Sequence, residues 1–134
     1  MAFRPRSLPF DDWPIVHQER WMKALEQNGP FRRSGRAAHW RPDSIKKTRK
    51  GYGVWLYWNV IKGASIRDTD PESLVSEGSV DAYLSTIEEV NNGWTPYNRA
   101  QELYDAIRVM TPHLKESSWH WLRTACDGAA CFED

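Results

Sequence analysis

The sequence predicts an all-α protein, folded as a single compact bundle of four to five short helices. Apolar residues recur at helical spacing in several segments, and proline, serine, threonine or glycine marks most of the segment ends. We find no run with the alternation of a half-buried strand. A chain of 134 residues is long enough for one domain with a real core and too short for two ordinary ones. We expect a flexible N-terminal arm (residues 1–10), one helical domain (residues 11–126) and a frayed C-terminal tail (residues 127–134).

The first helix is predicted to begin at Asp11 or Asp12 and to end near Gln27, where Asn-Gly-Pro stops it. Residues 31–41 then form an arginine-rich loop without an apolar period. The inward stripe expected for the first helix consists of Ile15, Val16, Met22 and Leu25.

The second helix is predicted to open at Pro42-Asp43-Ser44 and to end at Lys62, before Gly63. Its apolar stripe comprises Ile45, Thr48, Tyr52, Trp55, Leu56 and Asn59, and Lys46, Lys47 and Lys50 lie on the opposite side.

Two glycines, Gly51 and Gly53, lie inside the second helix. Each costs about 0.5–1 kcal/mol relative to alanine, so something must compensate. Either another helix crosses closely at this point, or the backbone approaches a ligand. We favour close packing.

Three further helices complete the prediction. One is capped by Ser76 and turns Val80, Tyr83, Leu84 and Ile87 inward and an acidic face outward. After the turn signal Asn91-Asn92-Gly93, the next helix opens at Thr95-Pro96 and ends near Thr111, and a short last helix begins near Ser117 or Ser118. The Thr95 helix is expected to bury Tyr97, Ala100, Leu103, Tyr104, Ile107 and Met110, and to expose Asn98, Glu102 and Asp105.

Charge is unevenly distributed although the formal net charge is zero. Residues 31–62 contain nine basic side chains and one acidic one, whereas residues 67–105 contain two basic and nine acidic ones. The positive region predicts an anionic partner. A lysine face on a helix is, however, most often simply solvated.

The sequence from Asp43 to Leu122 resembles the N-terminal core-binding domain of tyrosine recombinases, the phage-integrase family. Three segments carry the resemblance in order and spacing: SIKKTRKGYGVWLYW, PESLVSEGSVDAYLSTIEEV and WTPYNRAQELYDAIRVM. The resemblance implies a SAM-like helical bundle that forms one jaw of a clamp on double-stranded DNA, with two helices crossing the major groove. The DNA-binding residues that it implies, together with the arginine before the second helix, are Arg41, Lys46, Lys47, Arg49, Lys50, Thr95, Asn98 and Arg99.

No catalysis is expected from this chain, because the family's tyrosine nucleophile belongs to a separate C-terminal domain. The strings HQER (His17 to Arg20) and HWLR (His120 to Arg123) match the family's H-x-x-R motif, but we attribute them to chance. Cys126 and Cys131, together with two histidines, could be proposed as metal ligands, but their spacing is poor evidence for a zinc site. We therefore expect no metal and no cofactor.

The expected partners are duplex DNA and other recombinase subunits, with no membrane and no small-molecule substrate. Two cysteines and the lack of an apolar N-terminal run predict a reducing cytoplasmic setting, with nucleoid association when DNA is bound. Tyr57 and Trp58 fall on the lysine side of the second helix. Either the first helix or the arm covers them, or they meet DNA or another subunit. The competing functional class is a protein–protein adaptor that uses a tryptophan-rich surface.

Overall fold

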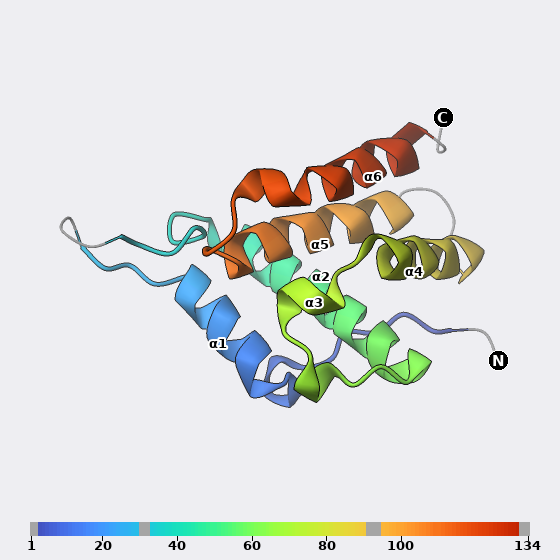
Figure 1. Cartoon of the computed structure of the whole chain (residues 1–134), viewed down its shortest axis with the longest axis horizontal. Helices are drawn as coiled ribbons and strands as arrows, with labels where there is room; N and C mark the ends of the chain where they lie inside the picture. Colours follow the sequence, from blue (N-terminus) through green and yellow to red (C-terminus); the bar gives the residue numbers. More distant parts are fainter. Residues whose placement is uncertain (1–2, 30–32, 91–94, 132–134) are drawn as a thin grey trace.

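The computed structural model describes residues 3–29, 33–90 and 95–131, and the side chains among them except Thr95 and those after Cys126 (Figure 1). These residues form a compact all-helical arrangement without a strand, which confirms the predicted class. No helix in the described ranges is long and apolar enough to cross a membrane. There are more helices than the four to five predicted: α1 (Ile15–Ala24), α2 (Pro42–Lys62), α3 (Pro71–Leu74), α4 (Glu77–Val90), α5 (Thr95–Met110) and α6 (His120–Cys131), with short 3₁₀ helices η1 (Phe10–Asp12), η2 (Ile66–Asp68) and η3 (Glu116–Trp119).

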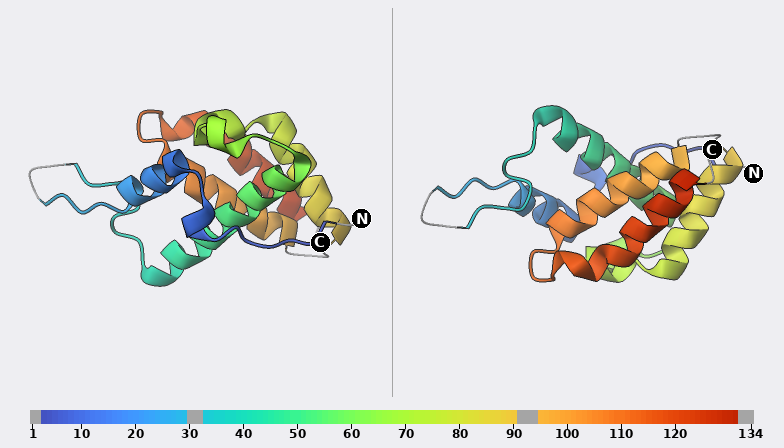
Figure 2. Two further views of the ribbon diagram at one scale, coloured as in Figure 1. Left: turned by 90° about the horizontal axis from the view of Figure 1, so that it is seen from below. Right: turned by 90° about the horizontal axis from the view of Figure 1, so that it is seen from above.

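Helix α5 runs through the middle of the bundle, with α6 packed on one side and α2 on the other (Figures 1 and 2). It also contacts α1 and α4. Its buried side chains therefore face several neighbours, and they include Ala100, Leu103, Ala106, Ile107, Val109 and Met110. Ending α5 at Met110, before Pro112, agrees with the prediction.

Helix α2 has the predicted bounds. Pro42 occupies the first turn, and Gly63 ends the helix with a φ of 93°, a left-handed conformation that glycine adopts without a steric penalty. The predicted stripe is buried, apart from the half-buried Ile45. Trp58 is also buried, stacked on Trp55 with 5.6 Å between ring centroids.

The predicted apolar stripe of the first helix is wrong. Ile15 and Met22 are 66% and 59% exposed, and Val16 is also exposed. The buried face instead carries His17, Trp21 and Ala24, because the large Trp21 ring removes more apolar surface from water than the smaller aliphatic side chains do. Asp11 and Asp12 belong to η1, and α1 ends at Ala24, short of Gln27.

Helix α4 confirms both its predicted cap and its faces. The Ser76 hydroxyl accepts a hydrogen bond from the Ser79 amide at 3.3 Å. Val80, Tyr83 and Ile87 are buried and Leu84 is half-buried, whereas the acidic face is exposed. The sequence did not predict α3, whose first turn is capped by Asp70, with 2.9 Å between its carboxylate and the Ser73 amide. The predicted turn at residues 91–93 lies outside the described residues.

The two chain ends differ from the prediction. Residues 3–9 are extended as expected, but they lie along α2 as part of the packed domain (Figure 2). Phe3 lies 6.0 Å from the Tyr57 ring between centroids and Arg6 lies over the same ring, so the arm partly covers Tyr57, which is half-buried. At the other end, α6 continues to Cys131, through residues that were predicted to begin a frayed tail.

Candidate nucleic-acid interface

The first half of α2 presents a group of basic side chains to solvent. Lys46, Lys47, Arg49 and Lys50 are all exposed, and Arg41 is exposed immediately before the helix. None of these five side chains forms an ion pair with a carboxylate in the described part of the chain, although Asp43 lies in the first turn of the same helix. The name "basic face" is used below for Lys46, Lys47, Arg49 and Lys50.

Two glycines allow other segments to pack closely against α2 on both sides of the basic face. A Cβ at Gly51 would clash with Glu102 of α5, and a Cβ at Gly53 would clash with Ser7 and Leu8 of the arm. Close packing therefore offsets the loss of helix stability caused by the two interior glycines, as the sequence analysis favoured.

On the α5 side, Glu102 is buried, only 4% exposed, where an outward orientation was predicted. Burial raises the pKa of the Glu102 carboxyl, and the charges of Arg99, Lys47 and Lys50 partly offset that effect by lowering the pKa. The missing side chain at Gly51 makes the space in which Glu102 is buried. Helical periodicity within α5 alone does not reveal this space.

Arg99 is bound to Glu102. Its Nε lies 3.0 Å from Oε1 as an ion pair without hydrogen-bond alignment, and its Nη2 donates to Oε2 at 3.3 Å. The guanidinium is largely covered and its charge is balanced, so Arg99 is a weaker candidate for a phosphate contact than the sequence indicated. Asn98 is half-buried, and the Thr95 side chain lies outside the described residues. Helices α2 and α5 nevertheless cross each other, and the N-terminal ends of both point toward the same edge of the molecule (Figure 2).

On the arm side, α2 and the arm enclose a cleft of about 240 Å³. The residues that line it are Ser7, Leu8, Pro9, Phe10, Trp13, Lys46, Arg49 and Lys50. The sequence predicted a flexible arm that could cover Tyr57 and Trp58, and it did not indicate a cleft beside the lysines of α2. Gly53 was the available signal, since it leaves room for the arm.

No family model, curated protein or solved structure matches this chain. The function of the basic face therefore rests on its own residues and their geometry.

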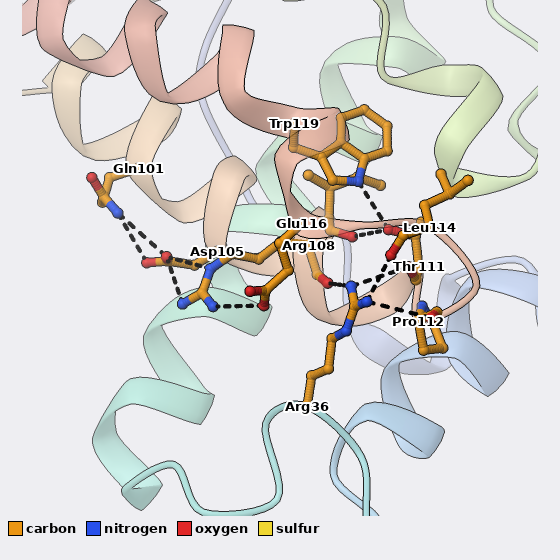
Figure 3. Close-up of polar contacts among 10 residues, drawn as sticks. Arg36, Gln101, Asp105, Arg108, Thr111, Pro112, Leu114, Glu116 and Trp119 are labelled. Carbon is orange, nitrogen blue, oxygen red and sulfur yellow. Dashed lines mark hydrogen bonds and ion pairs between the residues drawn. The ribbon is translucent and has the colours of Figure 1, made fainter.

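Arg36 from the basic loop is a structural residue rather than part of the interface. Its guanidinium donates to one backbone carbonyl oxygen in the last turn of α5 and to three in the segment that follows the helix (Figure 3). The acceptors and distances are Arg108 at 2.6 Å, Thr111 at 3.2 Å, Pro112 at 3.3 Å and Leu114 at 2.6 Å. The Arg108 carbonyl is one of those that a helix end leaves without an intrahelical partner, and a cation there complements the negative end of the helix dipole.

Neighbouring polar contacts on α5 hold the same region together. Arg108 pairs with Asp105 at 3.2 Å and with Glu116 at 3.5 Å (Figure 3). Its guanidinium also lies 5.6 Å from the centroid of the Trp40 ring. The Trp119 indole donates to the Thr111 hydroxyl at 2.9 Å. The loop that leads into α2 is thereby fixed to the far end of α5.

The first H-x-x-R string has structural partners. His17 Nε2 lies 2.8 Å from the Thr69 carbonyl oxygen and Nδ1 lies 2.8 Å from the Tyr52 hydroxyl, while Arg20 pairs with Glu72 at 2.7 Å. Burial lowers the pKa of His17, so the neutral ring donates to Thr69 and accepts from Tyr52. His120 and Arg123, of the second string, are exposed on α6.

Metal-ligating side chains do not gather in the described part of the chain. No group of three or more His, Cys, Asp or Glu there could hold an ion. Cys126 is buried, whereas the side chain of Cys131 lies outside the described residues.

Proposed function

We propose that this chain is a domain that binds duplex DNA, and that the basic face of α2 contacts the phosphate backbone. The observation that carries the proposal is that four exposed cations within residues 46–50 of one helix form no ion pair with a carboxylate in the described residues. Cations without partners can release the counterions condensed on DNA, which supplies sequence-independent affinity.

The more specific proposal is the core-binding domain of a tyrosine recombinase. Its support is the order and spacing of the three sequence segments between Asp43 and Leu122, together with the common side on which α2 and α5 begin. In that role the chain supplies affinity and register, whereas strand cleavage belongs to a separate catalytic domain. The covered state of Arg99 leaves α2 as the principal contact.

The test compares two triple variants of equal charge. Replacing Lys46, Lys47 and Lys50 with alanine removes cations from the basic face, and replacing Lys23, Arg67 and Lys115 removes as many exposed cations elsewhere. Fluorescence anisotropy with a labelled duplex, repeated at several salt concentrations, gives affinity and salt dependence. A plot of the logarithm of the association constant against the logarithm of the salt concentration changes in slope by roughly 0.9 for each phosphate neutralised. Loss of three phosphate contacts in the basic-face variant should therefore make this slope less steep by about 2.7. The control variant should change the slope by much less.

Two results would overturn the proposal. One is a wild-type chain that does not bind duplex DNA at low salt, and the other is a control triple variant that loses as much affinity as the basic-face variant. Both variants should keep the wild-type thermal midpoint, because the substituted side chains are exposed.

A protein–protein adaptor remains the second candidate, but on a different surface from the predicted one. The described tryptophans are buried or half-buried, so they do not form an exposed aromatic surface. The observation that favours an adaptor is the exposed apolar side of α1 formed by Ile15, Val16 and Met22. An interface there would be largely insensitive to salt.

A further inference from the structure

The cleft between the arm and α2 has two chemically different walls. Lys46, Arg49 and Lys50 of α2 supply one wall, and all three are exposed. The arm supplies the other wall, which is mainly apolar and includes Phe10, a half-buried aromatic ring. Cations therefore face an aromatic side chain across one small cleft.

The arm is held in place by hydrogen bonds that do not involve the cation side chains. The Ser7 hydroxyl donates to the Lys50 carbonyl oxygen at 2.8 Å, and the Leu8 amide donates to the Gly53 carbonyl oxygen at 3.0 Å. The Trp13 indole donates back to the Leu8 carbonyl oxygen at 2.9 Å, and the Phe10 and Trp13 rings pack in a T-shaped arrangement with 4.9 Å between centroids. The apolar wall is thus preorganised against the basic one.

Size and charge restrict what the cleft can hold. A volume of about 240 Å³ is below the roughly 300–1,000 Å³ of pockets that enclose a whole drug-sized ligand, so the cleft suits one unit of a longer molecule. Asp11 and Asp12 line a separate cleft on the other side of Leu8 and Trp13, and they do not line this one. An anion is therefore favoured here.

We propose that this cleft binds one nucleotide of a single-stranded nucleic acid. Its phosphate meets Lys46, Arg49 and Lys50, and its base stacks on Phe10. A cationic track beside an aromatic platform is the combination that binds single strands, whose bases are free to stack, whereas the bases of a duplex are already stacked on one another. This inference rests on the proposed function, because the cations that would contact duplex DNA would also contact the single strand. The arm adds a second wall, which only a single strand could use.

The test uses two substitutions of the same kind on the same arm. Phe10→Leu keeps an apolar side chain in the cleft but removes the aromatic face. Phe3→Leu makes the same change at a half-buried ring that contacts Tyr57 and does not line the cleft. Anisotropy is measured with labelled oligothymidylate of about 12 nucleotides, within the site sizes of such grooves, and with a duplex of equal length.

Wild type should bind both nucleic acids. Phe10→Leu should weaken binding of the oligothymidylate roughly fivefold or more, which corresponds to the loss of one base–aromatic stack, and should leave duplex affinity within about twofold. Phe3→Leu should leave both affinities at the wild-type level. Thermal midpoints measured on the same samples verify that each variant is folded.

Equal single-strand affinity of Phe10→Leu and wild type would overturn the proposal. So would displacement of the oligothymidylate by inorganic polyphosphate of matched charge as efficiently as by unlabelled oligothymidylate, since that result requires only the cations. If wild type binds duplex but not single strands, this proposal fails and the duplex proposal stands. If it binds neither, both fail.

Discussion

At the scale of single residues, neighbours in space decide what each charge does. Arg36 and Arg49 both belong to the basic segment, yet Arg36 is bound to backbone carbonyls whereas Arg49 is exposed beside the cleft. Glu102 and Glu88 both lie on helices with an acidic side, yet only Glu102 is buried. Sequence position does not distinguish the members of either pair.

Replacing Arg36 with alanine should destabilise the fold by roughly 2 kcal/mol, because the carbonyls at the end of α5 lose a charged hydrogen-bond donor. Urea unfolding followed by tryptophan fluorescence measures the change. Arg33→Ala is the matched control, since its exposed side chain has no hydrogen bond in the described residues, and its midpoint should not move. Equal midpoints for the two variants would contradict the structural role of Arg36.

Replacing Glu102 with glutamine should change how stability depends on pH. Burial raises the pKa of this carboxyl above its ordinary value of 4.5, so ionisation costs more in the folded than in the unfolded protein. The wild type therefore loses stability as pH rises from about 4.5 through the folded pKa. The stability of Glu102→Gln relative to wild type should rise over the same interval and then level off.

Thermal midpoints measured from pH near 4 to 7 test this, with Glu88→Gln, at an exposed carboxylate, as the control. A difference between Glu102→Gln and wild type that is constant with pH would show that Glu102 titrates as it does in water.

At the scale of elements, the segments that pack against α2 determine which part of its surface is exposed. Gly51 faces α5 and Gly53 faces the arm, so the basic face lies between two close contacts. The bounds of α2, its C-terminal glycine and its buried stripe were predictable, because they depend on local sequence and helical period. The buried side of α1 was not, because it depends on which side chains α5 and the arm offer to it.

Gly53→Ala should destabilise the protein, although alanine favours a helix by about 0.5–1 kcal/mol. The new methyl group would meet Ser7 and the Leu8 carbonyl oxygen and displace the arm, and overpacking of this kind costs about 1–3 kcal/mol. Urea unfolding measures the net effect, and faster trypsin cleavage after Arg6 reports release of the arm.

Gly78→Ala in α4 is the matched control, because a Cβ there meets nothing within 4 Å. It should stabilise the protein by up to about 1 kcal/mol. Stabilisation by both substitutions would show that the arm does not pack against Gly53 in solution.

At the scale of the whole molecule, zero net charge conceals a separation of charge. The exposed cations of α2 lie beside the arm, while Asp81, Glu88 and Glu89 are exposed on α4. An approaching polyanion is attracted by one surface and repelled by the other, which orients the encounter. The fold also places the arm beside the positive surface, where the arm and three of the cations line one cleft.

The sequence alone determined the helical class, the bounds of α2 and α5, the start of α4 and the exposed positions of the α2 lysines. Periodicity and caps act within a few residues, so local sequence is sufficient for them. Only the tertiary structure decided that Glu102 is buried against Gly51, that Arg99 is bound to it, that Arg36 caps α5 and that the arm and α2 form a cleft. Arg99 and Glu102 are only three residues apart, but their pairing depends on the burial of Glu102 against Gly51. The other contacts join residues far apart in the chain, where burial and hydrogen bonding depend on the partner that the fold brings close.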